Sequence, residues 1–369
     1  MYIIGLMSGS SLDGLDIAFV ELNGDEKIGV TWRMLCAETV PFSEVWQARL
    51  RDIEQTDAQT FARTHTYFGR YLAELVNGFL ERQRIKLHEV DLISSHGHTV
   101  FHDPQRYYTT QIGCGAALCA GTKIEVACDF RTQDVALKGE GTPLAPLADQ
   151  FLFAGHDFYL NIGGIANISA TIDNNMVAFD TSPANQILNR LAQQLGFEYD
   201  RNGEIAQKAT ADPRLATQLQ TFDYYGRKYP KSLSNQACQQ GFYPIIEAFD
   251  TDAATKLATM TQHIALKVSE AIDYLDTQKN NDLVLNSKQT RTLLATGGGA
   301  LNSYLIQNIA HFLTPQQVEI VVPDRSIIEF KEAILMTLMG YFRKKNIPNT
   351  LASVTAAQRN TIGGALYTY

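Results

Sequence analysis

Three glycine-rich loops each follow an apolar segment and could hold phosphate groups. They are Ser8-Gly9-Ser10-Ser11-Leu12-Asp13-Gly14, Asn161-Ile162-Gly163-Gly164-Ile165-Ala166-Asn167 and Ala295-Thr296-Gly297-Gly298-Gly299-Ala300-Leu301-Asn302. Phosphates are bound by backbone N–H groups, so such loops need glycine for close approach and hydroxyls as extra donors. Singly, each loop is equally compatible with an ordinary turn, and none has the P-loop or G-x-G-x-x-G pattern. Together the three loops predict a nucleotide site of a different type.

An aspartate that could act as a base stands just before the segment Thr181-Ser182-Pro183-Ala184-Asn185. Asp180 ends a predicted strand, and a carboxylate at such a point could take a proton from water or a hydroxyl. The alternative is structural, because Asp or Ser before Pro and an apolar helix is a common N-cap arrangement with Pro183 near the first helical position. The residues alone favour the cap.

Three histidines, His96, His98 and His102, suggest a zinc site. The spacing of four between His98 and His102 would suit a helix, but Gly97 and the β-branched residues around it predict a strand-to-loop segment instead. The corresponding alternative function is a metal-dependent hydrolase that uses these histidines with Asp129 or Asp149.

Composition indicates a globular protein of two domains. The chain has 369 residues, of which 45% are hydrophobic and 19% charged, and it is too long for one ordinary core. The net charge of −8 argues against a nucleic-acid partner, which needs a basic surface. The five cysteines form no C-x-x-C pair, so reduced thiols are expected. No signal peptide and no apolar stretch of about 20 residues is visible, and a cytoplasmic protein with no membrane partner is predicted.

The elements that must position these loops occur twice. Strands predicted at Tyr2–Met7 and Asp16–Leu22 flank the first loop, and about 155 residues later Phe158–Ile162 and Ala166–Ile172 flank the second. Duplicated units that face each other would bring both loops to one ligand. The pattern predicts an α/β fold of two RNase H-like domains, of the actin and sugar-kinase type, around a central nucleotide cleft.

The domain boundary is predicted in the turn-rich segment Lys138-Gly139-Glu140-Gly141-Thr142-Pro143. The first domain then comprises residues 1–140 and 345–369, and the second comprises residues 141–344. The chain is expected to return to the first domain after a long helix at Phe330–Arg343.

A set of ordered motifs resembles the anhydro-N-acetylmuramic acid kinases. Gly5-Leu6-Met7-Ser8-Gly9-Ser10-Ser11-Leu12-Asp13-Gly14-Leu15-Asp16 is similar to the opening signature of that family, with Ser10 in place of the usual Thr. Ser95-His96-Gly97-His98-Thr99 resembles its S-H-G-Q-T segment. The remaining motifs follow in the family's order up to Gly363-Gly364-Ala365-Leu366-Tyr367, so the resemblance covers nearly the whole chain.

The resemblance implies a function in peptidoglycan recycling. Members of this family use ATP and Mg²⁺ to open the 1,6-anhydro ring of anhydro-N-acetylmuramic acid with water and to phosphorylate the 6-oxygen. The resemblance also implies a homodimer.

The resemblance further assigns roles to residues of this chain. It makes Asp180 the catalytic base and places four residues at the sugar: His96, Gly97, Arg131 and Glu332. It places ATP against the three loops: Gly9, Ser10, Ser11, Leu12, Asp13, Gly14, Asp16, Gly163, Gly164, Asn167, Gly297, Gly298, Gly299 and Asn302. Asp13, with Asp16 as a second candidate, would hold Mg²⁺ through its waters. Without the resemblance, Arg131 and Glu332 would be interpreted as surface residues, and Asp13 and Asp16 as turn caps.

The chain departs from the family pattern around the expected sites. Ser182 and Ala184 replace two glycines of D-T-G-P-G-N, His98 replaces Gln, and the K-S-T-G-R-E segment becomes Lys231-Ser232-Leu233-Ser234-Asn235-Gln236. A glycine needed for positive φ or close approach cannot be replaced without cost. A third hypothesis is therefore a diverged relative that binds nucleotide or sugar without efficient turnover.

Overall fold

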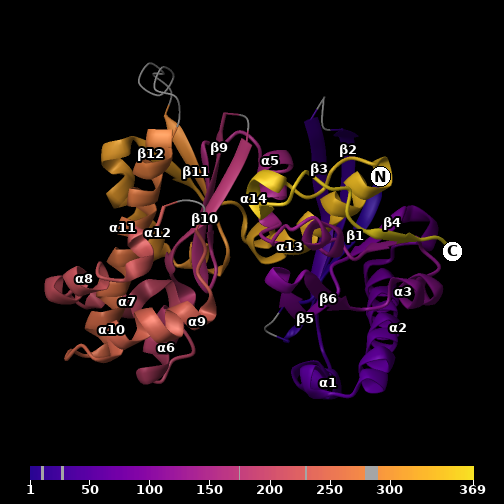
Figure 1. Cartoon of the computed structure of the whole chain (residues 1–369), viewed down its shortest axis with the longest axis horizontal. Helices are drawn as coiled ribbons and strands as arrows, with labels where there is room; N and C mark the ends of the chain where they lie inside the picture. The colour runs from indigo at the N-terminus through magenta and orange to yellow at the C-terminus, as the bar shows by residue number, and fades with distance from the viewer. Residues whose placement is uncertain (10–11, 26–28, 174, 229–230, 279–289) are drawn as a thin grey trace. The chain divides into compact units, whose positions relative to one another are not determined.

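The computed structural model describes the whole chain except residues 10–11, 26–28, 174, 229–230 and 279–289 (Figure 1). The chain divides into two compact units, one of residues 1–154 and 330–369 and the other of residues 155–329. The sequence placed these boundaries at residues 140 and 344, about one helix away at each point. None of the helices in the described ranges combines the length and apolar composition needed to cross a membrane.

The first unit is built on a six-stranded sheet in the order β13-β7-β4-β1-β2-β3. Its strands are β1 (Tyr2–Met7), β2 (Gly14–Asp25), β3 (Gly29–Pro41), β4 (Leu92–Ser95), β7 (Val126–Cys128) and β13 (Ala365–Tyr367). β1, β2 and β3 are antiparallel neighbours, whereas β4 and β7 run parallel to β1. A separate hairpin pairs β5 (His98–Asp103) with β6 (Tyr108–Ile112).

The second unit contains a five-stranded sheet in the order β10-β9-β8-β11-β12. Its strands are β8 (Phe158–Ile162), β9 (Ile165–Ile172), β10 (Asn175–Pro183), β11 (Arg291–Thr296) and β12 (Val318–Val321). β8, β9 and β10 are again antiparallel neighbours, and β11 and β12 again run parallel to β8. Because β3-β2-β1-β4-β7 has the same order and directions, the predicted α/β duplication is confirmed.

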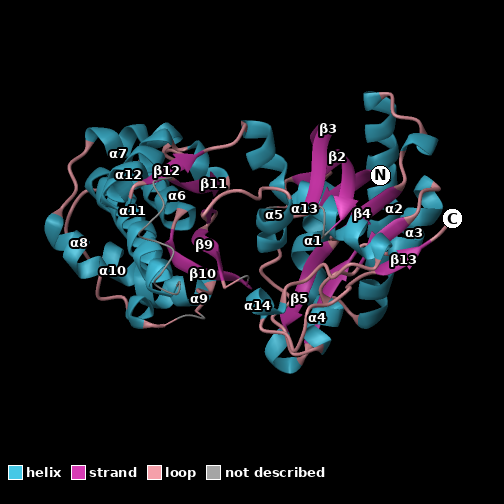
Figure 2. Cartoon of the chain, turned by 90° about the horizontal axis from the view of Figure 1, so that it is seen from above, coloured by secondary structure: helices cyan, strands magenta, loops and turns pink. Residues whose placement is uncertain are grey.

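Helices pack on both sheets (Figure 2). In the first unit they are α1 (Glu44–Asp52), α2 (Ala58–Gln83), α3 (Gly115–Thr122), α4 (Thr132–Ala136), α5 (Ala145–Phe151) and α14 (Ala352–Thr355). In the second they are α6 (Asn185–Gln194), α7 (Glu204–Lys208), α8 (Pro213–Leu219), α9 (Asn235–Ala237), α10 (Tyr243–Glu247), α11 (Ala253–Gln278) and α12 (Ser303–Leu313). α13 (Arg325–Lys345) begins in the second unit and from Phe330 onward belongs to the first.

Specific contacts explain why α5 and α13 join the first unit. The buried ammonium of Lys331 in α13 lies 2.7 Å from the carboxylate of Asp149 in α5. The indole of Trp32 in β3 donates to the carbonyl of Leu152 just after α5. A Cβ on Gly5 would lie 1.9 Å from the carbonyl oxygen of Ala333, so only glycine allows β1 to approach α13 this closely. These contacts place α5 and α13 from Phe330 onward in the first unit.

Candidate functional site

A hollow of about 400 Å³ in the first unit gathers most of the predicted sugar-binding residues. It is lined by Met7, Ser8, Gly9, His96, His98, Thr99, Arg131 and Glu332. We call it the His96 hollow. Met7 ends β1, His96 follows β4, and Arg131 follows β7. The carboxyl ends of parallel strands meet at one edge of a sheet, where α/β proteins commonly bind ligands.

His96 is buried and offers an acceptor to a ligand. Its Nδ1 lies 3.0 Å from the carbonyl oxygen of Gly97. A carbonyl can only accept, so Nδ1 carries the proton and Nε2 is left as an acceptor. Nε2 is buried without a hydrogen-bond partner among the described residues. Burial, assisted by the charge of Arg131, lowers the pKa of His96 to about 3, so the ring is neutral and suited to accept from a hydroxyl.

Arg131 and Glu332 form the charged part of the His96 hollow. The Nε of Arg131 is buried and has no partner in the described part of the chain. Burial lowers the pKa of Arg131 to about 10, while Glu332 acts in the opposite direction. Burial raises the pKa of Glu332, and Arg131 opposes that shift. Both residues line the hollow, with Arg131 half-buried and Glu332 exposed. Their roles at the sugar stay a prediction.

His98 contacts the first glycine-rich loop. Its Nδ1 lies 3.1 Å from the hydroxyl oxygen of Ser8, and both side chains are buried. Burial lowers the pKa of His98, so a neutral ring holds the Ser8 hydroxyl. The replacement of the family's Gln by His98 thus preserves a neutral polar side chain at this position.

Asp180 lies within β10 in the second unit and accepts a hydrogen bond from a distant loop. The backbone N–H of Leu233 donates to Oδ2 of Asp180 at 2.6 Å, and the hydroxyl of Tyr224 donates to the Asp180 carbonyl at 2.7 Å. Burial raises the pKa of Asp180 to about 6, although the Leu233 bond opposes the shift. The carboxylate is therefore held in place and has the proton affinity of a useful base.

The helix-cap alternative for this segment is wrong. α6 begins at Asn185 and has Ala184 at its N-cap, with no side-chain cap bond. β10 extends through Pro183, so Pro183 lies in the strand rather than in the first turn. Neither Ser182 nor Ala184 has a positive φ. Positive φ is therefore no reason for glycine at these two positions, but Ala184 has a φ of −134° and a ψ of −109°, outside the regions that non-glycine residues ordinarily adopt.

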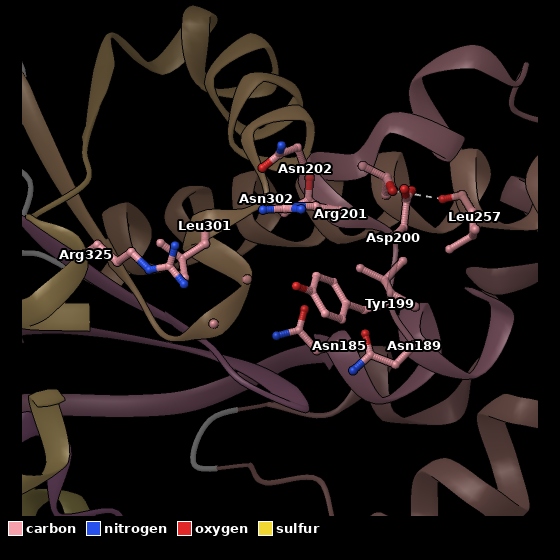
Figure 3. A pocket seen from close by; sticks show the side chains of 14 residues that line it. Asn185, Asn189, Tyr199, Asp200, Arg201, Asn202, Leu257, Leu301, Asn302 and Arg325 are labelled. Carbon is pink, nitrogen blue, oxygen red and sulfur yellow. Dashed lines mark hydrogen bonds between the residues drawn. The ribbon is translucent and has the colours of Figure 1, made fainter. Parts of the chain in front are cut away.

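A second hollow, of about 410 Å³, lies entirely within the second unit (Figure 3). We call it the Asn302 hollow. Of the predicted ATP-binding residues, Gly298, Gly299 and Asn302 line it. Residues that the sequence analysis missed also line it: Asn185, Leu188, Asn189, Tyr199, Asp200, Arg201, Asn202, Leu257, Thr261, Leu301 and Arg325. They come from five separate segments, and apart from Asn185 and Leu301 no local motif marks them.

The second and third glycine-rich loops lie against each other beside the Asn302 hollow. Gly297 has a φ of +79°, and a Cβ there would lie 2.7 Å from Oδ1 of Asn161. The amide of Asn185 donates to the carbonyl of Ile162 at 3.0 Å. The side chain of Asn302 caps α12 by accepting from the N–H of Leu305 at 3.0 Å. Glycine is thus needed at Gly297 and at Gly299, where a Cβ would lie 2.2 Å from Cγ2 of Ile162, whereas at Gly298 the nearest neighbour of a Cβ would be 3.8 Å away. The loop leads into a helix, and helix N-termini commonly bind phosphate.

The other predicted ATP-binding residues that the structure describes do not line the Asn302 hollow. Gly163 and Gly164 form the β8–β9 turn, whose carbonyls accept from the N–H groups of Asn185 and Ala184. Asn167 pairs with Asp180 across β9 and β10. In the first loop Gly9 lines the His96 hollow, and Ser10 and Ser11 lie outside the described residues.

The end of the first loop leads into β2. Leu12 has a φ of +60°, and Gly14 begins β2 against the carbonyl of Val40. Oδ1 of Asp16 accepts from the hydroxyl of Thr39 at 2.6 Å. Asp13 precedes β2 and is exposed, as a carboxylate that holds a hydrated cation would be.

The histidines do not form a metal site. His96 contacts the Gly97 carbonyl, His98 contacts Ser8, and His102 contacts the Thr109 hydroxyl. Over the described ranges, no group of three or more His, Cys, Asp or Glu side chains is placed to hold a metal ion. The metal-dependent hydrolase alternative is therefore not supported.

Comparison with known proteins gives a consistent result. A family model described as anhydro-N-acetylmuramic acid kinase matches residues 1–369. Curated relatives named anhydro-N-acetylmuramic acid kinase include those of Photobacterium profundum, 32% identical over 99% of this chain and 98% of the relative, and Haemophilus influenzae, 29% identical over 99% and 97%. Among solved structures, the activator of the 2-hydroxyisocaproyl-CoA dehydratase from Clostridium difficile with bound ADPNP is 14% identical, with a TM-score of 0.43 over 94% of this chain and 96% of that one.

Proposed function

The chain belongs to the anhydro-N-acetylmuramic acid kinase family, and we propose that it converts anhydro-N-acetylmuramic acid to N-acetylmuramic acid 6-phosphate with ATP. Water attacks the anomeric carbon, the bond from that carbon to the bridging oxygen breaks, and the freed 6-oxygen takes the terminal phosphoryl group of ATP. The product would enter peptidoglycan recycling in the cytoplasm. The observation that carries the proposal is the His96 hollow, which brings together His96, Arg131 and Glu332 from distant parts of the sequence.

Asp180 is the proposed base. Its carboxylate would accept the proton from the attacking water, because its pKa of about 6 leaves it ionised at neutral pH yet basic enough to act. The Leu233 N–H occupies one oxygen, Oδ2, which leaves Oδ1 for the water. Because Oδ2 is held by the Leu233 N–H, the carboxylate keeps the orientation in which Oδ1 faces the water.

The sugar would be held by the residues of the His96 hollow. The guanidinium of Arg131 can grip the lactyl carboxylate through two parallel bonds. Nε2 of His96 would accept from a sugar hydroxyl, and Gly97 permits close approach beside it. Glu332 would accept from another hydroxyl and partly balance the charge of Arg131.

ATP is the proposed phosphoryl donor, held by the three glycine-rich loops. The Asn302 hollow would take the nucleoside beside Gly298 and Gly299, with Tyr199 and Asn185 facing the same space (Figure 3). Mg²⁺, when bound with ATP, would neutralise charge on the phosphates. Asp13 fits the role of holding its waters, with Asp16 as the second candidate. We propose a homodimer as well, on the family resemblance.

The proposed reaction is tested by ADP release from Mg·ATP with 1,6-anhydro-N-acetylmuramic acid, a panel of hexoses and a sugar-free control. Turnover confined to the anhydrosugar is the expected result. ATP binding without ADP release above the control would overturn the proposal and favour the diverged relative. Size-exclusion chromatography with light scattering tests the homodimer.

A further inference from the structure

A third hollow, of about 130 Å³, lies in the second unit and carries an excess of positive charge. It is lined by Phe179, Thr181, Tyr225, Arg227, Lys231, Lys267, Glu270, Ala271 and Tyr274. We call it the Lys231 hollow. Three of these residues are cationic and one is anionic, and neither the proposed reaction nor the comparisons assign a role to the hollow.

The cations are held in place by aromatic rings. The ammonium of Lys267 is 4.0 Å from the ring centroid of Tyr225, and that of Lys231 is 4.7 Å from the ring centroid of Tyr224. Lys267 is buried and is also paired with Glu270 at 2.8 Å. Such contacts limit the conformations of long side chains, so less entropy is lost when the ammonium groups bind a ligand.

Lys231 remains without a carboxylate partner within the described residues. Burial and the neighbouring charge of Lys267 lower the pKa of Lys231, and Glu270 only partly compensates. Among the described residues that line the hollow, the one carboxylate, Glu270, is already engaged by Lys267. An anion placed between Lys231 and Arg227 would offset the repulsion between the positive charges of Lys231 and Lys267.

We propose that the Lys231 hollow binds the phosphate group of a small anion, either inorganic phosphate or a phosphomonoester. Lys231 and Arg227 would donate to the phosphate oxygens, and the buried Lys267 would contribute its charge at short range. The volume of the hollow, about 130 Å³, is enough for one tetrahedral oxyanion.

The position of the hollow gives such binding a consequence at Asp180. Phe179 and Thr181, which flank Asp180 in β10, line the hollow. Lys231 lies two residues before Leu233, and the N–H of Leu233 donates to the Asp180 carboxylate. A bound phosphate would hold this segment and thereby the direction of Asp180. This consequence rests on the proposed function, whereas the binding itself does not.

The test is isothermal titration of inorganic phosphate into the full chain saturated with a non-hydrolysable ATP analogue, which occupies the nucleotide's own phosphate positions. We expect one phosphate per chain, with binding weakened about tenfold or more in Lys231→Gln and in Arg227→Gln. Lys208→Gln removes an exposed charge outside the hollow and should bind like the unmodified chain. Both tested variants keep Lys267, so folding should be retained.

Absence of phosphate binding to the unmodified chain would overturn the proposal, and so would equal binding by the double variant Arg227→Gln/Lys231→Gln. Competition with glucose 6-phosphate separates inorganic phosphate from a phosphomonoester as the ligand. Displacement of bound inorganic phosphate by glucose 6-phosphate at similar concentration shows that the hollow accepts a phosphomonoester. The titration involves no turnover, so its failure is distinguishable from failure of the proposed kinase reaction.

Discussion

The backbone N–H of Leu233 lies 2.6 Å from Oδ2 of Asp180, which joins a loop to a strand 53 residues away. The loop is the segment in which this chain departs from the family's K-S-T-G-R-E motif. The bond uses the backbone of residue 233, so the change of side chain there leaves it intact. The proposed base therefore keeps its orientation despite the altered motif.

Asp180→Asn should abolish turnover, with a loss of at least about 10²–10⁴-fold, because an amide cannot accept the proton from water. The Asn carbonyl can still accept from Leu233, so the fold and ATP binding should be retained. Steady-state ADP release and nucleotide titration measure the two properties. Turnover close to that of the unmodified enzyme would rule out Asp180 as the base.

The pH dependence of kcat/KM should have an acid limb near pH 6. Burial raises the pKa of Asp180 from 3.8 to about 6, and the base must be unprotonated, so the rate should fall about tenfold per pH unit below that value. The folded state also binds this proton more tightly than the unfolded state, so Asp180 lowers stability as pH rises from about 4 through about 6. Asp180→Asn should lack this decrease in thermal unfolding experiments across the same range.

Arg131→Lys should raise KM for the sugar about tenfold or more and leave KM for ATP nearly unchanged. Lysine keeps the charge but loses the two parallel donors that match a carboxylate. Arg33→Lys serves as a matched control because Arg33 is an exposed residue paired with Glu21. Equal sugar KM values in both variants would place the carboxylate elsewhere.

The sequence predicted the strands better than the ligand pockets. β1 and β8 have the predicted bounds, because each is a short apolar run that ends in a glycine-rich turn. β13 was missed, since Ala365–Tyr367 becomes a strand only by pairing with β7.

The residues of the Asn302 hollow could likewise be predicted from the sequence only in part. The glycine-rich loops could be found because backbone approach to phosphate demands glycine in a local pattern. Tyr199 and Arg325 could not, since they are 126 residues apart and share the hollow only after folding. The residues around Asp180 alone favoured a helix cap, and only the family resemblance made it the base, because its contact with Leu233 forms only after folding.

His98→Gln should leave activity within about threefold of the unmodified enzyme, because Gln can also hold the Ser8 hydroxyl while remaining neutral. His98→Ala should raise KM for ATP, since the buried hydroxyl of Ser8 loses its 3.1 Å contact and the loop before Gly9 loses support at a cost of about 1–3 kcal/mol. Kinetics with varied ATP at fixed sugar would measure both effects. An unchanged ATP KM in His98→Ala would show that the contact does not support the loop.

Gly297→Ala and Gly163→Ala should separate structural from ligand-binding glycines. At Gly297 the backbone has a φ of +79° and a ψ of +165°, a region open essentially to glycine alone, so alanine should cost about 1–3 kcal/mol of stability. At Gly163 a Cβ would have its nearest neighbour 3.5 Å away, so the ligand-free protein should keep its stability. If Gly163 approaches a phosphate of ATP, its alanine variant should nevertheless bind the nucleotide less tightly. Denaturant unfolding without ligand and nucleotide titration provide the two readouts, and unchanged nucleotide affinity in Gly163→Ala would remove Gly163 from the proposed phosphate site.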